Sequence, residues 1–351
     1  MQRVGDIALF TGTSLSASNR SRVHAFLVIL IVWMVLSASL SVWMPLQFSI
    51  LTVFIFAGPH NWFELRYFLT RLPVRFGKSR PFFLTAFMGL GVLTLAYVSL
   101  PLLYRYGSWS EEQFATVIAI WNSLLLIWIG YLIHLRAKQR RRDWTWTIPV
   151  LLALSAFNWV QPDGFSLGLV YLHPLVALWF LDQQLRRTRP TFVKFYRGSL
   201  FALPLVLGLM ILQTAGAESL NDSNGLFWRI TQHSGAQLLP QVSSHMLVSI
   251  HVFLEMLHYG VWILALPLLA SLSSYRNVAE RTRCSKNWKI GVASHPRGFP
   301  KLIFGLLFVA TLLVIGLWAG FAYDYATARD IYFTIAIAHV LAEAPFLLRM
   351  L

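Results

Sequence analysis

Cysteine is almost absent from this chain, since Cys284 is the only one in 351 residues. A single thiol excludes an intrachain disulfide and any metal site built from several cysteines. Charged residues are also scarce: they make up 12% of the chain, about half of the share found in soluble domains. Because 57% of the residues are hydrophobic, no soluble core would cover so much apolar material, and a soluble enzyme is excluded. The composition indicates an all-α, polytopic integral membrane protein.

Acidic residues are few as well, 14 against 29 lysines and arginines, which gives a formal net charge of +15. Such a charge suits nucleic-acid binding, but the basic residues stand in short runs between long apolar stretches. That placement is typical of the cytoplasmic loops of membrane proteins. We therefore expect membrane lipids, and no nucleic acid, as partners of the basic runs. The sequence does not indicate an oligomeric state.

A cleavable secretory signal is also missing. The first 23 residues are polar and rich in serine, and the apolar run after them is long enough to span a bilayer without an evident small-residue cleavage site. We expect residues 1–23 to form a cytoplasmic segment and residues 24–351 to form a single transmembrane helical domain.

The chain is instead rich in long apolar segments. A membrane-spanning helix needs about 20 mostly apolar residues, and ten segments approach or exceed that length. They are residues 24–43, 47–69, 81–104, 115–135, 144–160, 165–182, 198–216, 246–270, 302–322 and 331–349. The second is interrupted by Gly58-Pro59, and we expect a break in the helix there. The fifth and sixth are short and separated only by the turn-forming residues 161–164.

The lysines and arginines are distributed very unevenly between the two sides of this ten-span arrangement. The side that holds the N-terminus carries 25 of the 29, the opposite side carries Arg105, Arg229 and Arg329, and Arg66 lies at a helix end. Basic residues favour the cytoplasmic side. We therefore place both termini in the cytoplasm and the chain in a bacterial cytoplasmic or internal membrane.

Three glutamates lie within apolar segments, where an ionisable side chain is costly and usually functional. Each has a histidine four positions earlier, and residues at this spacing share one face of a helix. The pairs are His60–Glu64, His251–Glu255 and His339–Glu343. His258 extends the second pair along the same face. The recurrence predicts three helices that each present an imidazole and a carboxylate in the same direction.

The ten-span arrangement makes these helices parallel, together with the helix of residues 165–182. A cavity between the four helices would collect imidazole and carboxylate groups, which are typical ligands of one or two iron ions. We expect four metal ligands: His60, His251, His258 and His339. Catalytic or supporting carboxylates would be Glu64, Glu255 and Glu343, and the neighbouring pocket residues would be His173, Tyr171 and Tyr259. We expect His233 and His245 to lie in solvated loops.

Two other functions use the same residues. Buried histidine and glutamate side chains also form proton relays in transporters, and they can simply hydrogen-bond helices together in a non-catalytic scaffold or assembly factor. Inverted repeats would favour a transporter, and none is visible in the sequence. A haem is not favoured, because no paired histidine spacing recurs on two helices.

The motif Gly58-Pro59-His60, together with the later histidines His251 and His258, resembles the Brp/Blh-type family of membrane β-carotene 15,15′-dioxygenases. The resemblance covers only these short pieces, and Asn61 and Glu255 stand where that family has glycine and a second histidine. It implies a membrane-embedded, iron-dependent oxidoreductase that activates dioxygen against a lipid-soluble substrate such as a carotenoid, another isoprenoid or a lipid. The number of iron ions and the substrate are left open by these departures.

Overall fold

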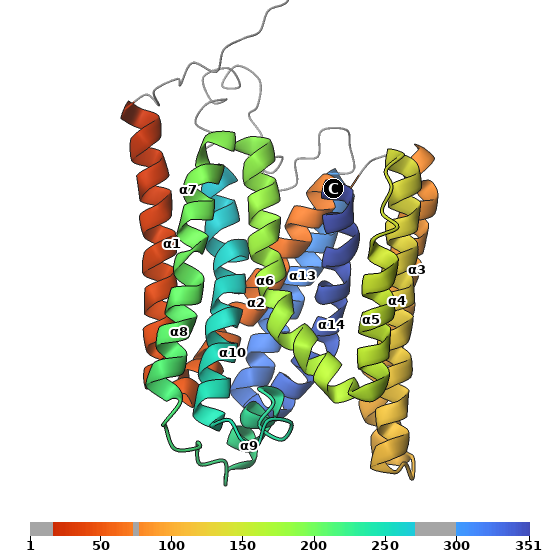
Figure 1. Cartoon of the computed structure of the whole chain (residues 1–351), viewed down its shortest axis with the longest axis vertical. Coiled ribbons are helices and arrows are strands. Elements are labelled where there is room, and N and C mark those ends of the chain that lie inside the picture. Colours follow the sequence, from red (N-terminus) through yellow and green to blue (C-terminus); the bar gives the residue numbers. More distant parts are fainter. Residues whose placement is uncertain (1–16, 73–76, 271–299) are drawn as a thin grey trace, which may run out of the picture.

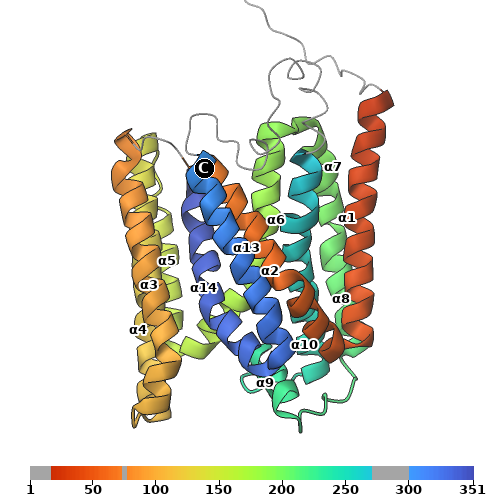
Figure 2. The same cartoon turned by 180° about the vertical axis from the view of Figure 1, so that it is seen from behind.

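A computed structural model describes residues 17–72, 77–270 and 300–351, and every regular element in these ranges is a helix (Figures 1 and 2). The helices are α1 (Ala17–Trp43), α2 (Pro45–Arg71), η1 (Gly77–Ser79), α3 (Arg80–Tyr106), α4 (Glu111–Arg140), α5 (Thr147–Val160), α6 (Pro162–Thr188), α7 (Pro190–Leu200), α8 (Ala202–Thr214), α9 (Gly225–His233), α10 (Ser244–Tyr259), η2 (Gly260–Ala265), α13 (Pro300–Tyr323) and α14 (Tyr325–Met350). The all-α prediction is confirmed for this part of the chain. Most of the expected N-terminal segment and most of the basic loop after residue 270 lie outside the described residues.

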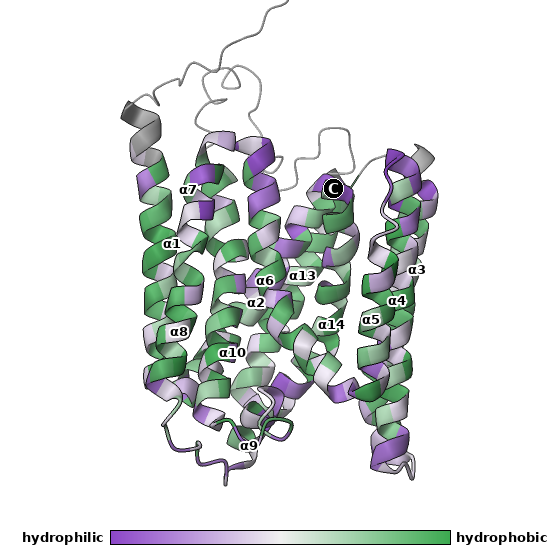
Figure 3. Cartoon of the chain, viewed as in Figure 1, coloured by the Kyte–Doolittle hydropathy of each residue, from purple (hydrophilic) through white to green (hydrophobic). Residues whose placement is uncertain are grey.

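Among the residues that the structure describes, eight helices are long and apolar enough to cross a membrane. They are Val23–Trp43, Arg80–Tyr106, Glu111–Arg140, Pro162–Thr188, Pro190–Thr214, Ser244–Ala270, Lys301–Tyr323 and Tyr325–Met350. The two remaining expected spans are also helical, but α5 has only 14 residues and α2 carries several polar and charged side chains. Figure 3 shows hydrophobic residues along the length of the helices and hydrophilic residues concentrated at their ends. Large side chains such as Leu95 and Leu212 are exposed on this surface, as expected where lipid is the solvent.

The bundle has two parts (Figures 1 and 2). Helices α3, α4 and α5 lie together on one side. On the other side α1, α2, α6 and α8 pack around α10, and α13 and α14 pack against each other and against α2. In the apolar central stretch of Ser244–Ala270, the segment that contains α10, 78% of the residues are buried, against 39% or less in each of the other seven candidate spans. This segment therefore runs through the interior of the protein, and polar side chains on any of its faces meet other helices instead of lipid.

Helix α2 does not break at Gly58-Pro59, contrary to the sequence-based expectation. It continues from Pro45 to Arg71 with Pro59 inside it. Proline at position 59 removes the backbone donor for the carbonyl of Ile55. Trp318 of α13 donates from Nε1 to the neighbouring Phe54 oxygen at 2.8 Å and joins the two helices there. A Cβ on Gly58 would lie 2.7 Å from Val314 Cγ1, so this glycine allows α13 to pack closely on α2 where the site residues begin.

The start of α1 and the end of α14 lie at the same end of the bundle (Figure 1). At that end Arg136 of α4 donates hydrogen bonds to the backbone oxygens of Leu348 and Arg349, at 3.0 and 2.7 Å. The last carbonyls of a helix have no partner within the helix. Arg136 therefore closes the C-terminal end of α14 and ties it to the neighbouring helix α4.

Candidate metal centre

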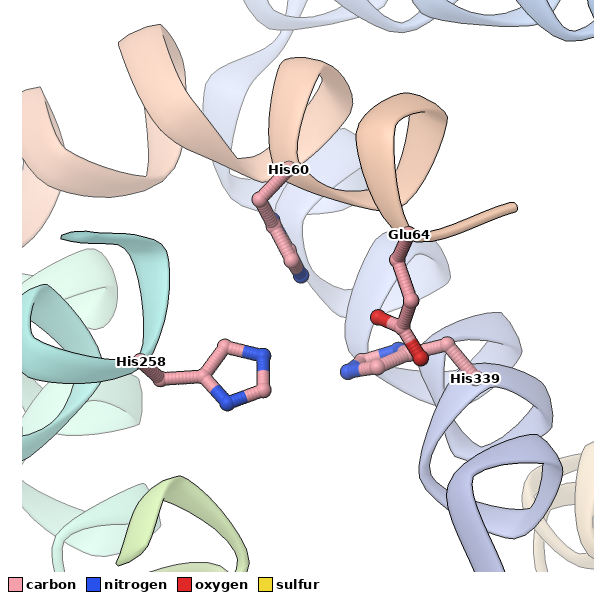
Figure 4. Close-up of side chains that lie close together, drawn as sticks. All are labelled: His60, Glu64, His258 and His339. Carbon is pink, nitrogen blue, oxygen red and sulfur yellow. The ribbon is translucent and has the colours of Figure 1, made fainter. Parts of the chain in front are cut away.

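Four histidines and two glutamates from four helices converge in the interior of the bundle. His60 and Glu64 come from α2, His258 from α10 and His339 from α14, and one ligand atom of each lies within 4.8 Å of the ligand atoms of the others. Figure 4 shows these four side chains pointing toward one another. A second group shares His258 and adds His173 of α6 and Glu343 of α14. Each residue lies in the middle or the second half of its helical span, away from the helix ends.

The ring of His60 is oriented by its own helix. Its Nδ1 atom lies 3.0 Å from the carbonyl oxygen of Phe56, one turn earlier. Because a carbonyl can only accept, Nδ1 carries the proton in this contact and the Nε2 lone pair is left free. Such a hydrogen bond on the far nitrogen is the usual support of a metal-binding imidazole. His60 is fully buried and its Nε2 has no hydrogen-bond partner.

His258 lies at the point where α10 changes its geometry. The π-helical segment η2 begins at Gly260, two residues later, and such segments often occur at functional sites. Gly260 packs against Trp33 of α1, whose Nε1 donates to the Met256 oxygen at 2.7 Å. Both ring nitrogens of His258 are buried and without a partner. This imidazole therefore has two free nitrogens, and it belongs to both groups of candidate ligands.

Glu343 and His173 face each other across α14 and α6. The Oε2 atom of Glu343 lies 3.3 Å from His173 Nδ1, and the His173 ring centroid is 4.6 Å from that of His258 and 5.2 Å from that of His339. Glu343 is 2% exposed. This carboxylate is thus placed either to bind a metal directly or to orient His173.

The unpartnered polar atoms show that the site fits a metal ion. Buried polar groups in proteins are nearly always hydrogen-bonded, yet the converging side chains leave many nitrogens and carboxylate oxygens without a partner. These atoms are His60 Nε2, Glu64 Oε1 and Oε2, His173 Nε2, His258 Nδ1 and Nε2, His339 Nδ1, and Glu343 Oε1. A bound cation would satisfy several of them at once. The histidine and glutamate group can therefore bind a metal ion; its donor set alone does not select iron.

Tyr259 and Tyr171, the two tyrosines expected in the pocket, have different positions. The Tyr259 ring lies 4.3 Å from that of His60, and its hydroxyl shares a hydrogen bond with the Tyr332 hydroxyl. Tyr171 donates to the backbone oxygens of Ser234 and Leu247, at 2.9 and 3.1 Å. Tyr259 therefore borders the metal centre, whereas Tyr171 ties α6 to the segment after α9 and to α10.

His251 and Glu255, which the sequence analysis grouped with the metal ligands, lie in a separate cluster. Neither belongs to the two groups of candidate ligands among the described residues. His251 Nε2 is 3.8 Å from Glu255 Oε1, and the His251 ring is 5.1 Å from that of His233 on α9. Positions 251 and 258 share one face of the helix, so the rise of about 10 Å between them along the axis gives the two histidines different neighbours.

Two members of this second cluster were not identified from the sequence. His233, expected in a solvated loop, ends α9 and packs 4.4 Å from the Phe333 ring. Arg329, counted among the outer charges, is only 3% exposed, and its guanidinium carbon lies 4.6 Å from the Phe333 centroid. The only feature of the sequence that could have predicted this burial is the spacing of Arg329 and Phe333, which are four residues apart and therefore neighbours on one helix face.

A cavity of about 890 Å³ adjoins both clusters. At the metal centre it is lined by His60, His173, His258 and His339. Its longer walls come from α4 and α14 and are largely apolar, with Trp121, Trp128 and Leu341 among them. It extends toward the end of the bundle that carries α9, where Glu111 and Asp163 line it. Volumes of this size accommodate a small organic ligand.

Comparisons of the chain with protein-family models, with curated proteins and with solved structures find no match. The resemblance to the Brp/Blh-type family therefore rests on the short motifs alone, and the function is argued from the site.

Proposed function

We propose that this protein is a membrane-embedded metalloenzyme with ten spans and both termini in the cytoplasm of a bacterial host. The ten spans are the eight apolar helices together with α2 and α5. An even number of spans agrees with α1 beginning, and α14 ending, at the same end of the bundle (Figure 1). The basic residues Arg136, Arg187 and Arg349 gather at this end, as cytoplasmic loops and helix ends do.

The proposed metal is non-haem iron, as one ion or as a pair. Imidazole and carboxylate ligands suit iron, and thiolate ligands, which would favour zinc or clusters, are absent from the described site. His60, Glu64, His258 and His339 would hold one ion, and His173 with Glu343 would either support it or help to hold a second. The observation that carries this proposal is the convergence of unpartnered, buried imidazole nitrogens and carboxylate oxygens from four helices.

The proposed reaction is oxygenation of a lipid-soluble substrate, such as a carotenoid, another isoprenoid or a lipid. Iron, when bound, would supply the activation of dioxygen. The protein itself would bind the substrate and keep the site dry. The apolar walls from α4 and α14 would hold a hydrocarbon beside the ligands and exclude water. The hydrogen bond from His60 to Phe56 keeps the ligating nitrogen in place. The cavity borders the ligands directly, so a substrate placed in it would lie next to the metal.

Metal analysis of the purified protein tests this proposal. We expect near-stoichiometric iron in the wild type and its loss in His258→Ala, while His134→Ala, a variant of an exposed histidine on α4, retains it. Lipid extracts from cells with and without the gene, grown under isotopically labelled dioxygen, should differ in a labelled apolar product. A protein that binds no metal, or identical extracts, would contradict the proposal. Proton transport by metal-free protein in vesicles would support the transporter instead.

A further inference from the structure

The second polar cluster forms one wall of the cavity that adjoins the metal centre. Gln232 and His233 of α9 and His251 and Glu255 of α10 all line the cavity. The opposite walls are mainly apolar. A cavity with a hydrocarbon-like chamber and one concentrated polar wall fits an amphiphilic molecule better than a pure hydrocarbon, because each surface then meets a matching part of the ligand.

Two acceptor atoms in this wall have no donor. Glu255 is 8% exposed, and its Oε2 atom is buried and unpartnered; the buried Oε1 atom of Gln232 is unpartnered as well. Leaving a buried acceptor unsatisfied is costly. Both atoms accept hydrogen bonds, so the missing partner is a group that carries a hydrogen-bond donor.

The charges around the wall select among the possible donors. The positive charge of Arg329 acts on Glu255 and on both neighbouring histidines, His233 and His251. A carboxylate has no proton to donate and would be repelled by Glu255. An ammonium group would be attracted by Glu255 but repelled by Arg329, and because Arg329 already balances the charge of Glu255, the cation would add an uncompensated buried charge. A hydroxyl group donates a proton and carries no charge, so it is the group that this wall accommodates at the lowest cost.

We propose that the cavity binds a long-chain neutral alcohol, with its hydroxyl donating a hydrogen bond to Glu255 and its hydrocarbon part along α4 and α14. This inference names the substrate class of the proposed metalloenzyme and rests on that function for the reaction, but binding itself requires no turnover. In this view Glu255 and His251 are substrate-binding residues, and the metal ligands are the histidines and glutamates of the other cluster.

Binding of radiolabelled hexadecanol to the purified full-length protein in nanodiscs tests the proposal. We expect saturable binding that unlabelled hexadecanol displaces at least tenfold better than hexadecane, hexadecanoic acid or hexadecylamine. Glu255→Met removes the acceptor of the hydroxyl and should weaken hexadecanol binding about tenfold, which corresponds to about 1.4 kcal/mol. Gln237→Met is the matched control, because Gln237 lines the exposed mouth of the same cavity and water replaces its contacts. It should leave the affinity unchanged.

Iron content measured on the same samples separates this inference from the proposed function. Glu255→Met should keep the wild-type iron content, whereas His258→Ala should lose it. Iron loss in Glu255→Met would show that the second cluster binds metal, and equal displacement by all four ligands would show that the wall recognises no head group. Either result overturns the alcohol proposal. Absence of iron in the wild type, with selective alcohol binding intact, would overturn only the metalloenzyme.

Discussion

The imidazole of His60 is tied through Nδ1 to the carbonyl oxygen of Phe56 at 3.0 Å, and its other nitrogen is directed into a group of unpartnered ligand atoms. This contact lies within a single helix, although the group it serves comes from four. Local geometry therefore sets the orientation of the ring, and the packing of α2 against α10 and α14 decides what the ring faces.

Replacing His60 by glutamine should reduce metal affinity at least tenfold, because an amide is a much weaker ligand than imidazole. The measurement is metal retention against a chelator, followed by elemental analysis. His134→Gln is the control, since His134 is exposed and outside both ligand groups. Equal metal retention by the two variants would remove His60 from the ligand set.

Replacing Glu343 by glutamine should weaken metal binding about ten- to a hundredfold, the range typical for partners of metal-binding histidines. The reason is the loss of the carboxylate that lies 3.3 Å from His173 Nδ1. Chelator competition measures the effect, with Glu111→Gln at the cavity mouth as the matched control. If Glu343→Gln binds metal as the wild type does, the pair formed by His173 and Glu343 has no part in the site.

A methyl group at position 58 should destabilise the protein, because the Cβ of Gly58→Ala would lie 2.7 Å from Val314 Cγ1. Overpacking of this kind typically costs about 1–3 kcal/mol. Thermal unfolding in detergent should show a lower midpoint, and Val314→Ala should restore most of it in the double variant. Gly91→Ala is the control, since a Cβ at position 91 would have no neighbouring atom within 4 Å. A normal midpoint for Gly58→Ala would show that α13 shifts freely.

The pair Asn122 and Asn158 should behave as a polar unit within the bundle. Asn122 Nδ2 donates to Asn158 Oδ1 at 2.8 Å, and both side chains are fully buried. Asn122→Leu leaves its partner without a donor and should cost about 1 kcal/mol, in the range of interhelical hydrogen bonds. The double variant Asn122→Leu/Asn158→Leu should recover part of that loss, which unfolding midpoints in detergent can establish. Additive losses would contradict the coupling.

Asp324 should make the start of α14 sensitive to acid. The hydrogen bonds that Thr327 donates to its carboxylate lower the pKa of Asp324 below its ordinary value of 3.8. A depressed carboxyl pKa stabilises the folded state above the unfolded pKa, and this contribution is lost as the pH falls through the folded value. The unfolding midpoint of Asp324→Asn should therefore be below that of the wild type at neutral pH, and the difference should shrink as the pH falls below 3.8. A constant difference at every pH would exclude a contribution from the charge.

Much of the architecture was predictable from the sequence. All ten expected segments are helical, because their apolar runs are long and the loops between them are polar or basic. The prediction of a helix break at Gly58-Pro59 was wrong. Helix α2 continues through the proline, and Gly58 allows α13 to pack closely against α2. Helical spacing alone identified His60, Glu64, His339 and Glu343, because each pair shares a helix face whatever the helix packs against.

Division of the polar residues into two clusters was decided by the tertiary structure. The sequence by itself determined a membrane bundle with imidazole and carboxylate pairs on three helices, since hydropathy and helical period are local properties. It did not determine that His258 would join the candidate metal ligands while His251 joined Glu255, His233 and Arg329, because the position and tilt of α10 depend on all its neighbours. Contacts such as Trp33 with Met256 and His233 with Phe333 bring together positions distant in the chain, and only packing establishes them.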